Sequence, residues 1–347
     1  MLSKVLLSIL IVSILFTSPF KTFANEEDMD EAAVAAEQKE EALLAQKREE
    51  LYRRMETLTH IPWYYIAAMD RYEKNIQRKS KEKNEFQNDR VTAITISPQV
   101  WSGGFNPIED DTNPSAIGIF HGIGRDGNGD GLAERNNDED VLYSIAEFIA
   151  QYGTTEKDVR IALWNYYLRN QTVKVISEFA TIINQYNRTY FAGDSFPIPR
   201  GYNYTYHNTW GDPRGWGGRR IHEGTDIFAG YGTPVRASRW GIIEIKGWNP
   251  YGGWRMGVRD LDNIYHYYAH LSSFNKKLKV GDIVEPGTVI GYVGSSGYGK
   301  PGTSGKFPPH LHYGMYRDNG RTEWSFDPYP SLKRWERAEY AKKKKKK

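Results

Sequence analysis

Cysteine is absent from this 347-residue chain, and its absence excludes two kinds of protein. A small scaffold held together by disulfides is impossible, and so is a metal site with thiolate ligands. Any metal site must therefore use histidine and carboxylate side chains. Hydrophobic residues make up 39% and charged residues 26% of the chain, which is typical of soluble globular proteins. The length is sufficient for two or three domains with their own cores.

A strong overall charge is also lacking. The formal net charge is +3, but the lysines from Lys342 to Lys347 contribute six positive charges, so the rest of the chain is slightly acidic. This run ends a predicted basic C-terminal tail over residues 331–347. We expect the tail either to attract anionic polymers of a wall or membrane, or only to aid solubility. No base-reading motif accompanies it, and we therefore expect no nucleic acid as a partner.

The longest apolar run is short and lies at the N-terminus. Lys4 is followed by an apolar stretch over residues 5–16, which is shorter than the roughly 20 residues needed to cross a bilayer. Small residues up to Ala24, followed by an acidic segment, fit a cleavage site. We predict a signal peptide over residues 1–24 and an exported, extracellular protein. Retention of this segment as a membrane anchor is the alternative.

The region after the predicted signal is expected to be mainly helical. Residues 25–58 are rich in alanine, glutamate, lysine and glutamine with a thin apolar stripe, which predicts a solvated helical stalk. A coiled coil with a partner is an alternative, but this segment lacks sustained heptads, and we expect a monomer. Residues 59–190 should form a helical domain. Its helices are expected to start at residues 61–63 and to continue near 140–152, 156–167 and 172–186.

The composition changes after a linker at residues 191–200, which contains Pro197 and Pro199. Residues 201–330 are rich in glycine and in β-branched and aromatic residues. Alternating runs such as residues 288–293, bounded by glycine and proline turns, are typical of short strands. We therefore predict a compact all-β domain over residues 201–330. The fold class is multidomain α plus β.

One glycine-rich segment of the helical region has the spacing of a calcium-binding loop. Asp126, Asn128 and Asp130 place oxygen side chains at alternate positions, and Gly131 occupies the sixth position. The twelfth position is Asn137, where a bidentate glutamate normally binds the ion. Structural calcium on Asp126, Asn128 and Asp130 is one interpretation, and a plain Asp/Gly turn is the other.

Histidine is scarce but concentrated, because six of the eight histidines lie in the predicted β domain. In a strand, residues two apart point to the same face, so His310 and His312 would share a face while Leu311 faces the core. His222 and Asp226 are four residues apart and share a face in extended or helical structure. The pattern therefore predicts that these polar side chains form one cluster.

Two imidazoles and a carboxylate, here His222, Asp226 and His312, are the usual protein ligands of a hydrolytic zinc site that keeps one position open for water. His270 and His310 are the natural pair to act as a base and to stabilise an oxyanion. The histidines expected to be structural are His60, His121 and His207, with His266 as a weaker alternative to His270.

These motifs resemble the M23 (lysostaphin-like) zinc endopeptidases. The resemblance covers about residues 200–328 and is carried by residues 208–214, 222–227, 268–271, 291–294 and 310–312. It implies an antiparallel β-sheet groove, zinc on the three predicted ligands, and catalytic help from His270 and His310. It also implies peptides of bacterial peptidoglycan as substrates. All five positions are filled, which favours an enzyme over a non-catalytic wall-binding or engulfment protein of the same fold.

The arrangement of the whole chain resembles the sporulation-associated endopeptidases of bacilli within that family, which cut the L-Ala–D-Glu bond of muropeptide stems. This closer resemblance rests on the order of signal, helical region and β domain rather than on a specificity motif. It implies a secreted enzyme that remodels the cell wall or the spore cortex. Residues 59–199 could also cover the groove as an inhibitory segment.

The helical region has a second resemblance, to lytic transglycosylase (lysozyme-like) domains. It is carried by residues 113–120, the Asp126 loop and residues 162–167. The catalytic acid of those domains would fall near Asp70, with Glu73 one turn further on. The chemistry needs a protonated acid, and Arg71 beside Asp70 would favour the ionised form. We therefore expect a domain that holds glycan strands or is purely structural, with glycan cleavage as the alternative.

Overall fold

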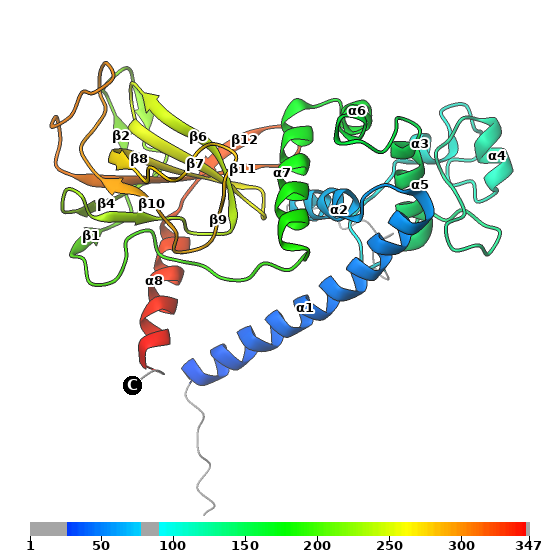
Figure 1. Cartoon of the computed structure of the whole chain (residues 1–347), viewed down its shortest axis with the longest axis horizontal. Helices are drawn as coiled ribbons and strands as arrows, with labels where there is room; N and C mark the ends of the chain where they lie inside the picture. The colour runs from blue at the N-terminus through cyan, green and yellow to red at the C-terminus, as the bar shows by residue number, and fades with distance from the viewer. Residues whose placement is uncertain (1–25, 78–89, 345–347) are drawn as a thin grey trace, which may run out of the picture. The chain divides into compact units, whose positions relative to one another are not determined.

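The computed structural model describes residues 26–77 and 90–344, and its contacts divide the chain into two compact units, residues 1–43 and 44–347 (Figure 1). The predicted signal peptide over residues 1–24 and the last three lysines of the basic run lie outside the described residues. Among the helices in the described ranges, none combines the length and the apolar character that a membrane span requires.

A long helix, α1 (Glu26–Thr59), forms where the alanine- and glutamate-rich composition predicts one. Its second half is not a solvated stalk, because Ala45, Tyr52 and Met55 are buried in the core of the helical region. The helices that follow in this region are α2 (Trp63–Gln77), α3 (Pro98–Ser102), α4 (Pro114–Ile119), α5 (Asp138–Ala150), α6 (Glu156–Tyr167) and α7 (Asn170–Tyr186).

The starts of these helices are fixed by local hydrogen bonds. Helix α6 begins at the predicted residue because Thr155 and Asp158 form a capping box, in which each side chain bonds the other residue's backbone N–H. Helix α5 begins after Asn137, whose side chain accepts hydrogen bonds from the backbone N–H groups of Glu139 and Asp140. Asn137 is therefore a helix cap.

Asp70, near which the transglycosylase resemblance places a catalytic acid, is buried with 2% of its surface exposed. The hydroxyl of Tyr52 donates to its Oδ2 at 2.6 Å, and the backbone N–H groups of Ala93 and Ile94 donate to its Oδ1. Both oxygens are thus used to join helix α2 to neighbouring segments. This position is unsuited to protonating a sugar oxygen, and a lysozyme-like character of the helical region stays a prediction.

Glu73 is also buried, and the Tyr167 hydroxyl donates to its Oε1 at 2.7 Å. Burial raises the pKa of Glu73 to about 7, although the hydrogen bond from Tyr167 lowers it in part. The folded state therefore binds a proton more tightly than the unfolded state, whose pKa is near 4.5. The resulting stabilisation is complete below pH 4.5 and is lost as the pH rises through about 7.

We expect Glu73→Gln to stabilise the protein at pH 8 by on the order of 3 kcal/mol, because glutamine still accepts the Tyr167 hydroxyl and carries no charge to bury. Thermal unfolding at pH 5 and pH 8 measures this effect. The gain at pH 8 should be several degrees and should shrink toward pH 5. Glu50→Gln, at an exposed position of α1, is the control and should show no such trend. Equal gains at both pH values would contradict the burial argument.

The C-terminal half of the chain folds as an antiparallel β domain, as the sequence predicts. One ten-stranded sheet has the order β1-β4-β11-β8-β7-β6-β9, with β10 paired to β5 and β8, and β12 paired to β11. Strands β2 (Pro213–Arg214) and β3 (Arg220–Ile221) form a separate pair. The strands of the large sheet are β1 (Tyr204–Tyr206), β4 (Thr225–Ala229), β5 (Pro234–Arg236), β6 (Gly241–Asn249), β7 (Gly253–Asp260), β8 (Ile264–Phe274), β9 (Ile283–Val284), β10 (Val289–Val293), β11 (His310–Asp318) and β12 (Glu323–Phe326).

The chain does not become a tail at residue 331, because α8 (Tyr329–Lys344) continues the fold (Figure 1). Leu332 and Trp335 lie three residues apart, so they share one helix face, and both are buried in the core of the β domain. The predicted linker is packed as well, since Phe196 and Ile198 are buried in the same core. The sequence pattern did not reveal this helix, because it is rich in lysine and contributes only Leu332 and Trp335 to the core.

Candidate metal centre

Strand β11 lies between β4 and β8 in the sheet, which brings distant parts of the sequence together. His312 pairs with Asp226 on one side and with Ala269 on the other. As the spacing predicts, Leu311 is fully buried in the core while His310 and His312 share the opposite face. The sheet therefore places the side chain of Asp226 beside that of His312.

His222 completes the cluster from the loop between β3 and β4, outside any strand. Its Nδ1 lies 2.7 Å from the backbone oxygen of Thr209. A carbonyl oxygen only accepts, so Nδ1–H donates and the lone pair of Nε2 is left for a ligand. The Thr209 hydroxyl also accepts the backbone N–H of Asp226 at 3.0 Å. Thr209 thus positions two members of the cluster, a role that the sequence did not reveal.

The donor atoms of the cluster converge on one point. His222 Nε2 lies 2.8 Å from His312 Nδ1 and 3.1 Å from Asp226 Oδ1, and His312 Nδ1 lies 3.2 Å from the same oxygen. A tetrahedral zinc ion with bonds of about 2.0–2.2 Å keeps its ligands about 3.4 Å apart. The residues therefore fit zinc in donor chemistry and in spacing. In the ranges that the structure describes, this is the one group of three histidine or acidic residues close enough to hold a metal ion.

The sequence near the cluster allows this close approach. Gly224 packs against the ring of His312, and a Cβ at that position would lie 2.6 Å from His312 Cε1. Such a distance is far below a normal carbon contact, so any larger residue would displace the imidazole. The glycine two residues after His222 is therefore a steric requirement of the site.

The charges at the cluster favour a bound cation. Burial raises the pKa of Asp226, but the adjacent imidazoles of His222 and His312 lower it more, so that it lies well below its usual range. Burial lowers the pKa of His312, which favours the neutral imidazole that binds metals. The guanidinium of Arg214 lies 3.0 Å from Asp226 Oδ2 and holds the second carboxylate oxygen. Arg214 lies inside a motif that the sequence highlighted, but its contact with Asp226 was not predicted.

His270 reaches the cluster because of a β-bulge. In a regular strand it would face the core with His266 and Tyr268, which are buried there. The register between β7 and β8 shifts at this point, and His270 has a φ of 60°. The extra residue turns the His270 side chain to the face of the sheet that carries His310 and His312. The ring centroid of His270 lies 4.8 Å from that of His310. Sequence alternation alone gives no sign of this reversal.

His270 and His310 have the same tautomer. The Nδ1 atoms lie 2.7 Å and 2.9 Å from the backbone oxygens of Ser296 and Pro308, respectively, so both Nδ1–H groups donate. The Nε2 atom of each ring is therefore unprotonated and free to accept a proton. Nε2 of His310 lies 3.6 Å from Asp226 Oδ1. Burial, together with the nearby His310 and His312, lowers the pKa of His270 well below its usual value.

A pocket with a volume of about 480 Å³ opens over the cluster. Its walls are largely aromatic, and Trp216 stacks on one of them, Tyr298, with ring centroids 4.6 Å apart. Aromatic walls with a few polar groups at the base are typical of a site that binds an extended organic ligand. The aromatic residues that line it are Phe228, Tyr251, Tyr267, Tyr298, Phe307 and Tyr316.

The histidines expected to be structural lie outside this pocket. His266 belongs to a network in the core, where its Nε2 lies 2.8 Å from Asp260 Oδ2 and its Nδ1 lies 2.6 Å from the Tyr313 hydroxyl. It is 1% exposed, so it does not contact a ligand in the pocket. The histidines that stay apart from the cluster are His60, His121 and His207.

In the predicted calcium loop, side-chain oxygens accept hydrogen bonds from the loop's own backbone N–H groups. Asp126 accepts hydrogen bonds from the N–H groups of Gly129 and Gly131, and Asn128 accepts one from Asp130. Asp140 is the buried acid beside the loop, and it accepts N–H groups from both ends. Since Asn137 caps helix α5, the loop matches the Asp/Gly turn, and the structure gives calcium no support.

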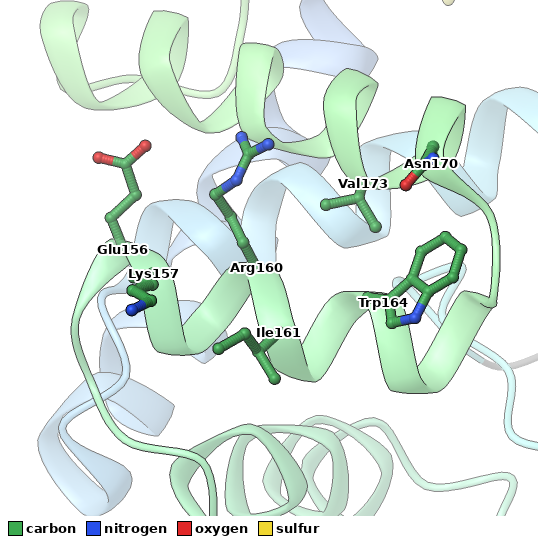
Figure 2. A pocket seen from close by; sticks show the side chains of 7 residues that line it. All are labelled: Glu156, Lys157, Arg160, Ile161, Trp164, Asn170 and Val173. Atoms are coloured by element: carbon green, nitrogen blue, oxygen red, sulfur yellow. The ribbon is translucent and has the colours of Figure 1, made fainter.

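A second pocket of about 600 Å³ lies between helices α6 and α7 in the helical region. Figure 2 shows the side chains of Trp164, Asn170 and Val173 close together at one end of it, and Glu156 and Lys157 at the other. It contains no histidine and offers one carboxylate, so it has no metal-binding set. The indole of Trp164 is 42% exposed and provides an aromatic face.

Comparison with known proteins finds relatives of this chain. Residues 220–325 match the sequence profile of Peptidase family M23. The chain is 57% identical over 298 residues to the L-Ala–D-Glu endopeptidase of Bacillus subtilis (strain 168), which covers 86% of this chain and 91% of that protein. It is 36% identical to the glycyl-glycine endopeptidase ALE-1 of Staphylococcus capitis, over 44% of this chain and 36% of that one. Among solved structures, the catalytic domain of lysostaphin from Staphylococcus simulans matches at 36% identity and a TM-score of 0.30, over 38% of this chain and 92% of that one. The extent and identity of the Bacillus subtilis match show that this chain belongs to peptidase family M23.

Proposed function

We propose that this protein is a zinc-dependent endopeptidase that hydrolyses the L-Ala–D-Glu bond in the stem peptides of peptidoglycan. The observation that carries the proposal is the convergence of His222, Asp226 and His312 at the base of an open pocket. The choice of bond is supported by the name of the Bacillus subtilis relative, since the match spans nearly all of that protein. The activity belongs to the β domain over residues 201–330.

His222, Asp226 and His312 hold the zinc ion in this proposal. When bound there, zinc would supply a Lewis acid for the carbonyl group and for water near neutral pH. Thr209 keeps the imidazole of His222 in the tautomer that binds, and Arg214 keeps the carboxylate of Asp226 in place.

His270 and His310 are the proposed catalytic residues. Each presents Nε2 to the same space, because each donates Nδ1–H to a backbone oxygen. The unprotonated Nε2 of one residue accepts a proton from the attacking water and passes it to the leaving amine. A protonated Nε2 on the other donates a hydrogen bond to the carbonyl oxygen as negative charge develops there. The matching hydrogen bonds of the two Nδ1 atoms support this pair.

The remaining partners follow from the substrate. Stem peptides lie outside the cytoplasmic membrane, so the protein acts as an exported enzyme in the cell wall or spore cortex. The α6–α7 pocket is proposed to hold the glycan strand, since the exposed face of Trp164 beside polar side chains suits a sugar ring. The final lysines would attract anionic wall or membrane polymers. Glycan cleavage has no support from Asp70, whose carboxylate is buried and fully bonded.

Mass spectrometry of purified muropeptides after incubation with the full chain tests the proposed function. We expect two products: a muramyl fragment that ends at L-Ala, and a released stem peptide with a new D-Glu amino terminus. A chelator should stop their formation, and added zinc should restore it. Intact muropeptides with zinc-loaded protein would support the alternative of a wall-binding protein without activity. Anhydro-sugar products that resist the chelator would instead assign glycan cleavage to the helical region.

A further inference from the structure

The proposed substrate carries a negative charge beside the bond that is cut. D-Glu has two carboxyl groups, and the peptide continues through one of them. Whichever group that is, the other stays free as a carboxylate on the residue that contributes the scissile nitrogen. A free carboxylate at that position is best bound by a cationic side chain on the pocket wall beside the metal. Two arginines, Arg214 and Arg220, line the pocket.

Arg214 already forms ion pairs with carboxylates of the protein. Its guanidinium lies 3.0 Å from Asp226 Oδ2 and 4.0 Å from Asp212 Oδ2. Moving it to a substrate would release the second oxygen of a proposed zinc ligand. Arg214 is therefore better suited to hold Asp226 than to bind the substrate.

Arg220, unlike Arg214, is exposed and does not hold a residue of the cluster. It lies on β3, directly opposite Arg214 in the β2–β3 pair. The structure shows no ion pair to it from any described carboxylate. Its guanidinium lies 5.2 Å from the ring centroid of Tyr251, another residue of the pocket wall. That ring limits the positions of the guanidinium through a cation–π contact and leaves its N–H groups for an anion.

Building on the proposed function, we propose that Arg220 binds the free carboxylate of the D-Glu residue and so determines specificity for an acidic residue after the scissile bond. The planar guanidinium can bind a carboxylate through two parallel hydrogen bonds, which an amide oxygen cannot reproduce. Arg220 lies two residues before His222, and both line one pocket. The site would therefore discriminate between a free carboxylate and its amide.

Two stem peptides that differ only at this group test the inference: one carries D-Glu with its free carboxylate, and the other carries the corresponding amide. We expect the wild-type full chain to prefer the acid by about tenfold in kcat/KM. Arg220→Gln should lower kcat/KM for the acid, mainly through KM, and leave the amide almost unchanged, so that the preference disappears. Arg220→Lys keeps the charge and should keep part of the preference.

Arg219→Gln is the matched control, because Arg219 is the exposed neighbour and does not line the pocket. It should keep the wild-type preference, and all variants should retain zinc. Equal cleavage of the two peptides by the wild type, or an equal loss on both peptides in Arg220→Gln, would overturn the role of Arg220 while leaving the proposed function intact. If the wild type cuts neither peptide, the proposed function fails and the role of Arg220 fails with it.

Discussion

Replacing His312 with alanine is expected to abolish zinc binding and to lower turnover of muropeptides by roughly three orders of magnitude or more. His312 Nδ1 lies within 3.2 Å of donor atoms on both His222 and Asp226, so its loss leaves two ligands in place of three. Two ligands hold zinc far more weakly than three. Zinc content of the purified protein and kcat for stem-peptide cleavage are the two measurements.

The fold should survive this change, because the His312 ring faces the pocket while Leu311 and Tyr313 form the core of β11. Circular dichroism of the variant checks that point. His207→Ala is the matched control, since His207 is exposed and lies outside the pocket, and it should keep full zinc and full turnover. Normal turnover by a zinc-free His312→Ala protein would show that the cluster has no part in catalysis.

The second large effect is expected from His270→Ala and from His310→Ala. Each should retain zinc and lose about 10²–10⁴-fold in kcat, because each removes an Nε2 that moves or donates a proton without removing a ligand. KM should change little. Zinc content measured beside kcat and KM separates this outcome from that of His312→Ala.

The kcat of the double variant should be only slightly below that of the less active single variant, because two residues that act as a unit give non-additive losses. His121→Ala, which lies in the helical region outside the pocket, serves as the control for histidine loss. Wild-type turnover in His310→Ala would remove that residue from the mechanism and would leave His270 as the sole candidate.

The sequence predicted the parts of the site that depend on local spacing. His310 and His312 share a face because a strand alternates, and no long-range information is needed for that. The residue types predicted that Asp226 and His312 belong to one cluster. They did not predict the pairing of β4 with β11, which brings together two residues that are 86 positions apart. The bulge that turns His270 depends on the register of three strands, which local pattern does not encode.

The main errors arose where tertiary packing overrides composition. The second half of α1 was predicted as a solvated stalk from its charged residues, but Tyr52 and Met55 bury one face of it. The C-terminal segment was predicted as a tail from its lysines, but Leu332 and Trp335 are enough to fix a helix against the sheet. In both segments two or three buried residues decide the structure, and average composition conceals them.

The most direct test of the metal centre is X-ray diffraction at the zinc absorption edge from crystals of the purified full chain and of His312→Ala. We expect one strong anomalous peak in the wild type, within about 2.2 Å of His222 Nε2, Asp226 Oδ1 and His312 Nδ1. The peak should vanish in the variant. Active wild-type crystals whose zinc lies elsewhere, with these three side chains apart, would contradict the proposed site.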